Sequence, residues 1–142
     1  INEVGYVYYK VFEYELLIKE QHLDSYGHVN NAVYLELYEE ARWDFITKEG
    51  YGYEKIHSTQ KGPVVLEANV KFKREMKLRD KIVIKTLNQW IKGKVMGFSQ
   101  HMINEQGKVC SEADFTVGFM DMKLRKLIEP TEEWLIACGM TK

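Results

Sequence analysis

The hydrophobic pattern divides the chain into a strand, a long helix and a run of further strands. Residues 6–19 are rich in Val, Tyr and Phe and alternate in polarity, which predicts a strand. Residues 31–49 instead repeat apolar side chains at helical spacing. Leu35 and Ile46 fall on another side of that helix, so it is apolar around much of its girth. Such a helix should be wrapped by other structure rather than laid on a surface.

The second half of the chain predicts strand after strand. Apolar and polar residues alternate over 64–73, 81–90, 95–104 and 109–119. Short turns at 92–94 and 105–108 favour antiparallel neighbours, and 130–138 predicts a short helix capped by Thr131.

This order of elements predicts an α+β fold class, with an antiparallel sheet and one long helix on one face. A chain of 142 residues is enough for a single domain over 1–142. The free face and the edges of such a sheet need cover, which favours a homo-oligomer.

Composition and charge exclude several classes of protein. The formal net charge of −1 gives no whole-molecule attraction to nucleic acid. Stretches without a charged residue, such as 95–104, are too short to cross a bilayer. The first residues show no secretory signal pattern, and Cys110 and Cys138 are the only cysteines. We therefore expect a cytoplasmic protein without a membrane partner or a disulfide framework.

Charge is unevenly distributed along the chain. Residues 71–81 hold six basic side chains and two acidic ones, and the basic ones include Lys71, Lys73 and Arg74. One interpretation is a solvated strand edge with its connecting loop. The other is a local anion site suited to a small phosphorylated ligand.

The candidate chemistry lies in residues 22–31, where a polar loop runs into the long helix. A helix start presents unpaired backbone N–H groups, which are good donors to an oxyanion. A carboxylate such as Asp24, on a loop that pivots at Gly27, can lie near the same point and activate water or attack directly. An electrophilic carbonyl held between them would be hydrolysed. The alternative is that Asp24 is only a turn residue.

Other sites are less well supported by the sequence. The spacing of His22, Asp24 and His28 matches no strong zinc pattern, so we expect no metal site. Neither cysteine lies at a helix start that would lower its pKa. The chain has no nucleophile elbow and no glycine-rich phosphate loop.

The loop and helix contain a longer motif. It comprises His22-Leu23-Asp24-x-x-Gly27-His28-Val29-Asn30-Asn31-Ala32-x-Tyr34-Leu35, followed by Glu39-Glu40-Ala41-Arg42 and, further on, Ala68-Asn69-Val70-Lys71-Phe72. The motif closely resembles the acyl-CoA thioesterases of the hotdog fold. The subgroup is the 4-hydroxybenzoyl-CoA thioesterase family, most nearly its long-chain acyl-CoA hydrolases. The resemblance implies a sheet wrapped around one long central helix, and a homodimer or homotetramer with active sites between chains.

The resemblance also implies roles for single residues. Asp24 matches the family's catalytic aspartate, and Asn31 falls where a backbone N–H polarises the thioester carbonyl. His28 and Asn30 match motif positions without an assigned duty. By charge, Lys71, Lys73 and Arg74 are candidates for binding the CoA phosphates. The implied substrate is an acyl-CoA and no separate cofactor is needed, because CoA is part of the substrate.

Two alternatives remain open at this point. One is a hotdog dehydratase or hydratase, in which His28 would pair with Glu36 or Glu39 on the helix; the usual His-Phe-Pro lead is missing. The other is an acyl-CoA-binding domain without activity. The acyl group is also open, although several apolar residues are candidates for lining a channel: Tyr34, Tyr38, Met96, Phe98 and Phe119.

Overall fold

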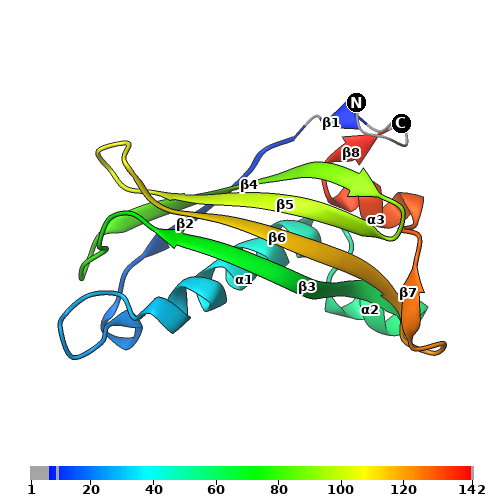
Figure 1. Cartoon of the computed structure of the whole chain (residues 1–142), viewed down its shortest axis with the longest axis horizontal. Helices are drawn as coiled ribbons and strands as arrows, with labels where there is room; N and C mark the ends of the chain where they lie inside the picture. The colour runs from blue at the N-terminus through cyan, green and yellow to red at the C-terminus, as the bar shows by residue number, and fades with distance from the viewer. Residues whose placement is uncertain (1–6, 9, 142) are drawn as a thin grey trace.

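The structure is a computed structural model that describes residues 7–8 and 10–141. Its centre is a six-stranded antiparallel sheet with strand order β2-β4-β5-β6-β3, in which β7 pairs with β6 (Figure 1). The strands are β2 (Phe12–Leu17), β3 (Lys61–Phe72), β4 (Lys81–Lys92), β5 (Val95–Ile103), β6 (Val109–Asp121) and β7 (Lys126–Ile128). The sheet curves over the long helix α1 (Asn31–Lys48), as the expected fold class requires.

The sequence explains both ends of α1. Asn30 is the N-cap, and its side chain accepts a hydrogen bond from the N–H of Ala32. At the other end, the N–H groups of Gly50 and Tyr51 donate to the carbonyls of Thr47 and Ile46. This is a Schellman motif, which needs the positive φ of 90° that Gly50 adopts readily.

The core lies between α1 and the concave face of the sheet. α1 contributes Tyr34, Leu37, Tyr38, Ala41, Phe45 and Ile46, all buried. The alternating residues of the strands meet them, among them Ile82, Ile84, Phe98, Met102, Phe115 and Val117. The helix is therefore wrapped, as its broad apolar surface predicts.

The four strands expected in the second half are confirmed with small shifts at their ends. The expected strand over 6–19 is divided: β1 (Val7–Tyr8) pairs with the C-terminal β8 (Met140–Thr141), and β2 joins the main sheet. Tyr6 lies outside the described residues. The short turns do join β4–β5 and β5–β6 as antiparallel neighbours, whereas β3 and β4 lie apart in the sheet. The connection over 73–80 is longer than a hairpin turn, so it can cross from one edge towards the other.

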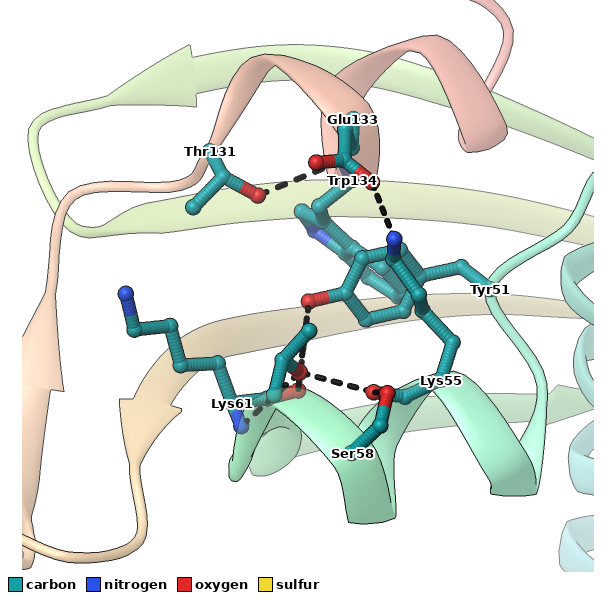
Figure 2. A network of polar contacts seen from close by, with 8 residues as sticks. Tyr51, Lys55, Ser58, Lys61, Thr131, Glu133 and Trp134 are labelled. Carbon is teal, nitrogen blue, oxygen red and sulfur yellow. Dashed lines mark hydrogen bonds and ion pairs between the residues drawn. The ribbon is translucent and has the colours of Figure 1, made fainter.

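Two short helices lie at the end of the molecule remote from the 20–30 loop (Figure 1). The helix α3 (Glu132–Ala137) has Thr131 as its N-cap, as expected. The sequence analysis missed α2 (Tyr53–Thr59), whose seven residues are too few to show a clear period. Figure 2 shows how the two helices are joined, with Lys55 of α2 paired to Glu133 of α3.

Tyr51 is central to this junction. Its hydroxyl lies 3.3 Å from the carbonyl oxygen of Lys61, at the start of β3 (Figure 2). Its ring meets that of Trp134 edge to face, with centroids 5.3 Å apart. The junction therefore fixes the start of β3 against both short helices. Among the described residues, no helix is long and apolar enough to span a membrane.

Candidate active site

The loop before α1 is closed by hydrogen bonds between its own two sides. After the short 3-10 helix η1 (Glu20–His22), Leu23 forms an antiparallel bridge with Val29. The N–H of Asp24 donates to the carbonyl of His28 at 2.8 Å, and Gly27 supplies the positive φ of 81° at the tip. Val29 N–H donates to Met76 O at 3.1 Å, which ties the loop to the β3–β4 connection. The loop therefore holds Asp24 at the entrance to α1.

The half-buried Asp24 carboxylate has two different oxygens. Its Oδ1 accepts the N–H groups of Tyr26 at 2.8 Å and His28 at 3.3 Å, which is an Asx turn. Its Oδ2 has no hydrogen-bond partner among the residues that the structure describes. The turn role and the chemical role are thus compatible, because one oxygen orients the carboxylate and the other stays available.

The first backbone amides of α1 also differ in whether they have a hydrogen-bond acceptor. Ala32 N–H donates to the Asn30 side chain and Val33 N–H to the Asn30 carbonyl, both at 2.9 Å. The N–H of Asn31 has no acceptor within 7–8 and 10–141. It therefore remains as a donor for a ligand oxygen, at the end of the helix that carries partial positive charge.

Asp24 and Asn31 line a common cleft of about 400 Å³, called here the loop–helix cleft. Tyr34 and Phe72 form part of its wall, with ring centroids 4.9 Å apart. Burial raises the pKa of Tyr34 above its usual value, so its hydroxyl is neutral at pH 7. The cleft thus combines a carboxylate, a free amide and aromatic surface.

The three basic candidates differ in position. Lys73 and Arg74 line the loop–helix cleft, and Lys71 does not. Lys73 pairs with Glu112 at 3.1 Å, which also lowers the pKa of that carboxyl. Arg74 forms no ion pair with any described residue. Arg74 is therefore the most available cation at this cleft.

His28 also lines the cleft, but its partner is not a helix carboxylate. Its Nε2 lies 2.8 Å from Oε2 of Glu75, on the β3–β4 connection. Glu36 and Glu39 are exposed on α1 and neither lines this cleft. Within the single chain, His28 is therefore not paired with Glu36 or Glu39 as the dehydratase alternative would need.

The remaining sequence candidates have structural explanations. Asn30 does not line the cleft and acts as the helix cap. The Nδ1 of His22 accepts the N–H of Lys19 at 2.9 Å. Within the described ranges, no group of three His, Cys, Asp or Glu side chains is placed to hold a metal ion.

The five residues expected to line an acyl channel differ in their positions. Tyr34 lines the loop–helix cleft, and Phe98 lines a second cleft, between the middle of α1 and the start of β3. The other three (Tyr38, Met96 and Phe119) are buried in the core and line neither of these two clefts. Sequence reasoning missed Arg42 in the second cleft. One feature of the sequence could have indicated Arg42. It is a charged residue at a position of the helical repeat that is otherwise filled by apolar side chains.

Comparisons with known proteins agree with this geometry. The family model described as Thioesterase-like superfamily matches residues 18–137. The long-chain acyl-CoA thioesterase FadM of Escherichia coli (strain K12) is 34% identical over 116 residues, which cover 80% of this chain and 86% of FadM. The solved structure of YbaW, a probable thioesterase from Escherichia coli, is 31% identical with a TM-score of 0.79, and the match covers 89% of this chain and 95% of YbaW.

A more distant structure shows the same fold. A Staphylococcus aureus protein solved in complex with CoA has a TM-score of 0.85 at 14% identity, over 92% of this chain and 83% of that protein. The fold is thus the hotdog fold that the sequence motif implies. This chain belongs to the thioesterase-like superfamily.

Proposed function

We propose that this chain hydrolyses acyl-CoA thioesters to free acid and CoA in the loop–helix cleft. The observation that carries the proposal is the shared cleft of Asp24 and Asn31, with one free carboxylate oxygen and one free amide. Membership of the superfamily and the similarity to FadM support the same reaction.

The thioester carbonyl lies between these two groups. The Asn31 N–H donates to the carbonyl oxygen as negative charge develops there, a contribution of about 3 kcal/mol in comparable sites. The Asp24 carboxylate acts on the carbonyl carbon, either as general base for water or as a nucleophile that forms a mixed anhydride. In both routes the C–S bond breaks, and the sulfur takes up a proton that derives from water and leaves as the CoA thiol. In the second route water then hydrolyses the mixed anhydride, which releases the free acid and restores Asp24.

The basic side chains at the rim bind the CoA phosphates. Arg74 is the strongest candidate because it lines the cleft and has no ion-pair partner among the described residues. Lys73 forms an ion pair with Glu112, which offsets its charge. Lys71 would attract the phosphates only at longer range, through the electrostatic potential around the strand. No further cofactor takes part in the proposed chemistry.

The active form is a homodimer or homotetramer. β3 is an edge strand, since among the described strands it pairs only with β6. Near its middle, Val65 and Leu66 are 46% and 49% exposed. A second copy paired along this edge would cover both the backbone groups and the apolar side chains.

A thiol-release screen over short, medium, long and aromatic acyl-CoAs tests the proposed reaction. A chromogenic disulfide reports the CoA thiol, and we expect turnover with at least one chain class. Saturable acyl-CoA binding without thiol release would identify a binding domain instead. Loss of enoyl absorbance without thiol release would identify a hydratase.

A further inference from the structure

A buried arginine lines the second cleft, and no carboxylate of the described residues binds it. Arg42 is 8% exposed, and burial lowers the pKa of its guanidinium to about 10, so it remains charged at pH 7. Its Nη1 donates to Oε1 of Gln100 at 2.8 Å, and its guanidinium stacks on the ring of Phe115 at 4.3 Å. Glu39 also lines this cleft and acts on Arg42 through its charge, but the described residues show no hydrogen bond between the two side chains.

The guanidinium is held in place from the sheet side. The Nε2 of Gln100 donates to the hydroxyl of Thr86 at 2.9 Å and to the carbonyl of Tyr38 at 3.2 Å. The amide of Gln100 is thus fixed, and it takes only one of the five N–H groups of Arg42. The remaining donors have no acceptor among the described residues, and Arg42 opens into the cleft.

The rest of this second cleft is mostly apolar. It has a volume of about 300 Å³, and its wall includes Val64, Val65, Phe98 and Val117. A plain alkyl chain seated here would take water away from the remaining N–H groups of Arg42 without giving them an acceptor. The cleft therefore suits an alkyl chain that carries an oxygen.

Both clefts lie between α1 and β3. Asn31, Tyr34 and Phe72 line the loop–helix cleft, and Arg42 and Val65 line the second one. Arg42 lies about 16 Å along the helix axis from Asn31, at about 1.5 Å per residue. An acyl chain whose carbonyl is held at Asn31 and which runs along α1 away from Arg74 would reach Arg42 with its distal part.

We infer that Arg42 is a specificity-determining residue that selects acyl chains with a hydrogen-bond-accepting oxygen (hydroxyl, oxo or carboxylate) in their distal part. This inference rests on the proposed thioesterase function. It predicts that the enzyme discriminates between chains of equal length by their oxygen substituent. A hydrogen bond to a charged group corresponds to a preference of about ten- to hundredfold.

The test compares kcat/KM for pairs of acyl-CoAs of equal length, one unsubstituted and one with a distal hydroxyl, oxo or carboxylate group. The wild type should prefer an oxygenated chain, and Arg42→Met should lose most of that preference. Lys48→Met is the matched control, because Lys48 is an exposed cation on the same helix outside this cleft, and it should keep the preference. Because the ratio is measured within one protein preparation, a partly unfolded variant does not distort it. If Arg42→Met fails to fold, Arg42→Lys takes its place and should fold. Its ratio of kcat/KM for the oxygenated chain to kcat/KM for the plain chain should be lower than that of the wild type but still above one.

The outcomes separate the two claims. No thiol release from any acyl-CoA would contradict the proposed function and this inference with it. Release at equal rates from plain and oxygenated chains would contradict the inference alone. An unchanged ratio in Arg42→Met would also overturn it, and would assign Arg42 to holding α1 on the sheet or to contact with a second copy.

Discussion

At the scale of single residues, the loop–helix cleft depends on atoms that the fold leaves without partners. Asp24 uses Oδ1 for its own turn and presents Oδ2. The Asn30 cap accepts the N–H groups of Ala32 and Val33, and the Asn31 N–H has no acceptor in the described part of the chain. The motif predicted which residues form the site. Only the structure shows which of their atoms are hydrogen-bonded within the fold and which are available to a substrate.

Arg74 gives a prediction at this scale. Arg74→Met should raise KM for an acyl-CoA about tenfold with little change in kcat, because a charge-assisted contact to phosphate is lost. The same variant should act normally on an acyl thioester that lacks the nucleotide. The matched control is Lys71→Met, which removes the same charge from a residue outside the cleft and should change KM less. Equal effects of both variants would mean that only the general field of the strand matters.

The sequence could not rank the three basic residues. Lys71, Lys73 and Arg74 have similar charge and spacing in the chain. Their difference arises from the pairing of β3 with β6, which brings Glu112 within 3.1 Å of Lys73. Arg42 was missed for a similar reason, since its partner Gln100 lies on a distant strand.

At the scale of elements, the N-terminus of α1 affects both the stability of the fold and the proposed catalysis. Asn30→Ala removes the cap and should lower the free energy of unfolding by about 1 kcal/mol. It should also lower kcat, because the first turn no longer holds the Asn31 amide in place. Urea denaturation and thiol-release kinetics measure the two effects.

Two variants serve as controls for this prediction. Asn30→Ser retains a capping oxygen and should recover most of the stability and activity. Asn31→Ala retains the backbone N–H and should keep most of the activity. A complete loss of turnover in Asn31→Ala would show that the side chain also binds the substrate.

The long elements were readable from the sequence and the short ones were not. The apolar period over 31–49 and the alternation over 109–119 each extend over many residues, so they predicted α1 and β6. The seven residues of α2 and the three of β7 carry too little pattern. Both are fixed by contacts across the sequence, such as Lys55 with Glu133 and the pairing of β7 with β6.

At the scale of the whole molecule, the free edge of β3 is the feature with the largest consequence. The chain order suggested that neighbouring strands pair, which holds for β4–β5–β6 but not for β3 and β4. Because the 73–80 connection crosses the sheet, β3 becomes an edge strand beside the loop–helix cleft. Sequence pattern alone does not specify such a crossing, because it depends on the packing of the sheet around α1.

Association along this edge can be tested by native mass measurement. We expect a mass of two or four chains for the wild type. Ala68→Asp places a carboxylate on the exposed middle of β3 beside Glu67, so like charges would meet across the edge and shift the population towards monomer. Gln89→Asp adds the same charge to an exposed site on β4 and should leave the assembly unchanged. A monomeric wild type with full activity would contradict this arrangement.

The most direct test of the account is the rate of thiol release by Asp24→Asn on the best acyl-CoA of the screen. Asp114→Asn is the matched control, since Asp114 is exposed on β6 outside the cleft. We predict that Asp24→Asn folds normally and loses about 10²–10⁴-fold in kcat/KM, whereas Asp114→Asn keeps the wild-type rate. Hydrolysis by Asp24→Asn at close to the wild-type rate would contradict the central claim that this carboxylate acts on the thioester.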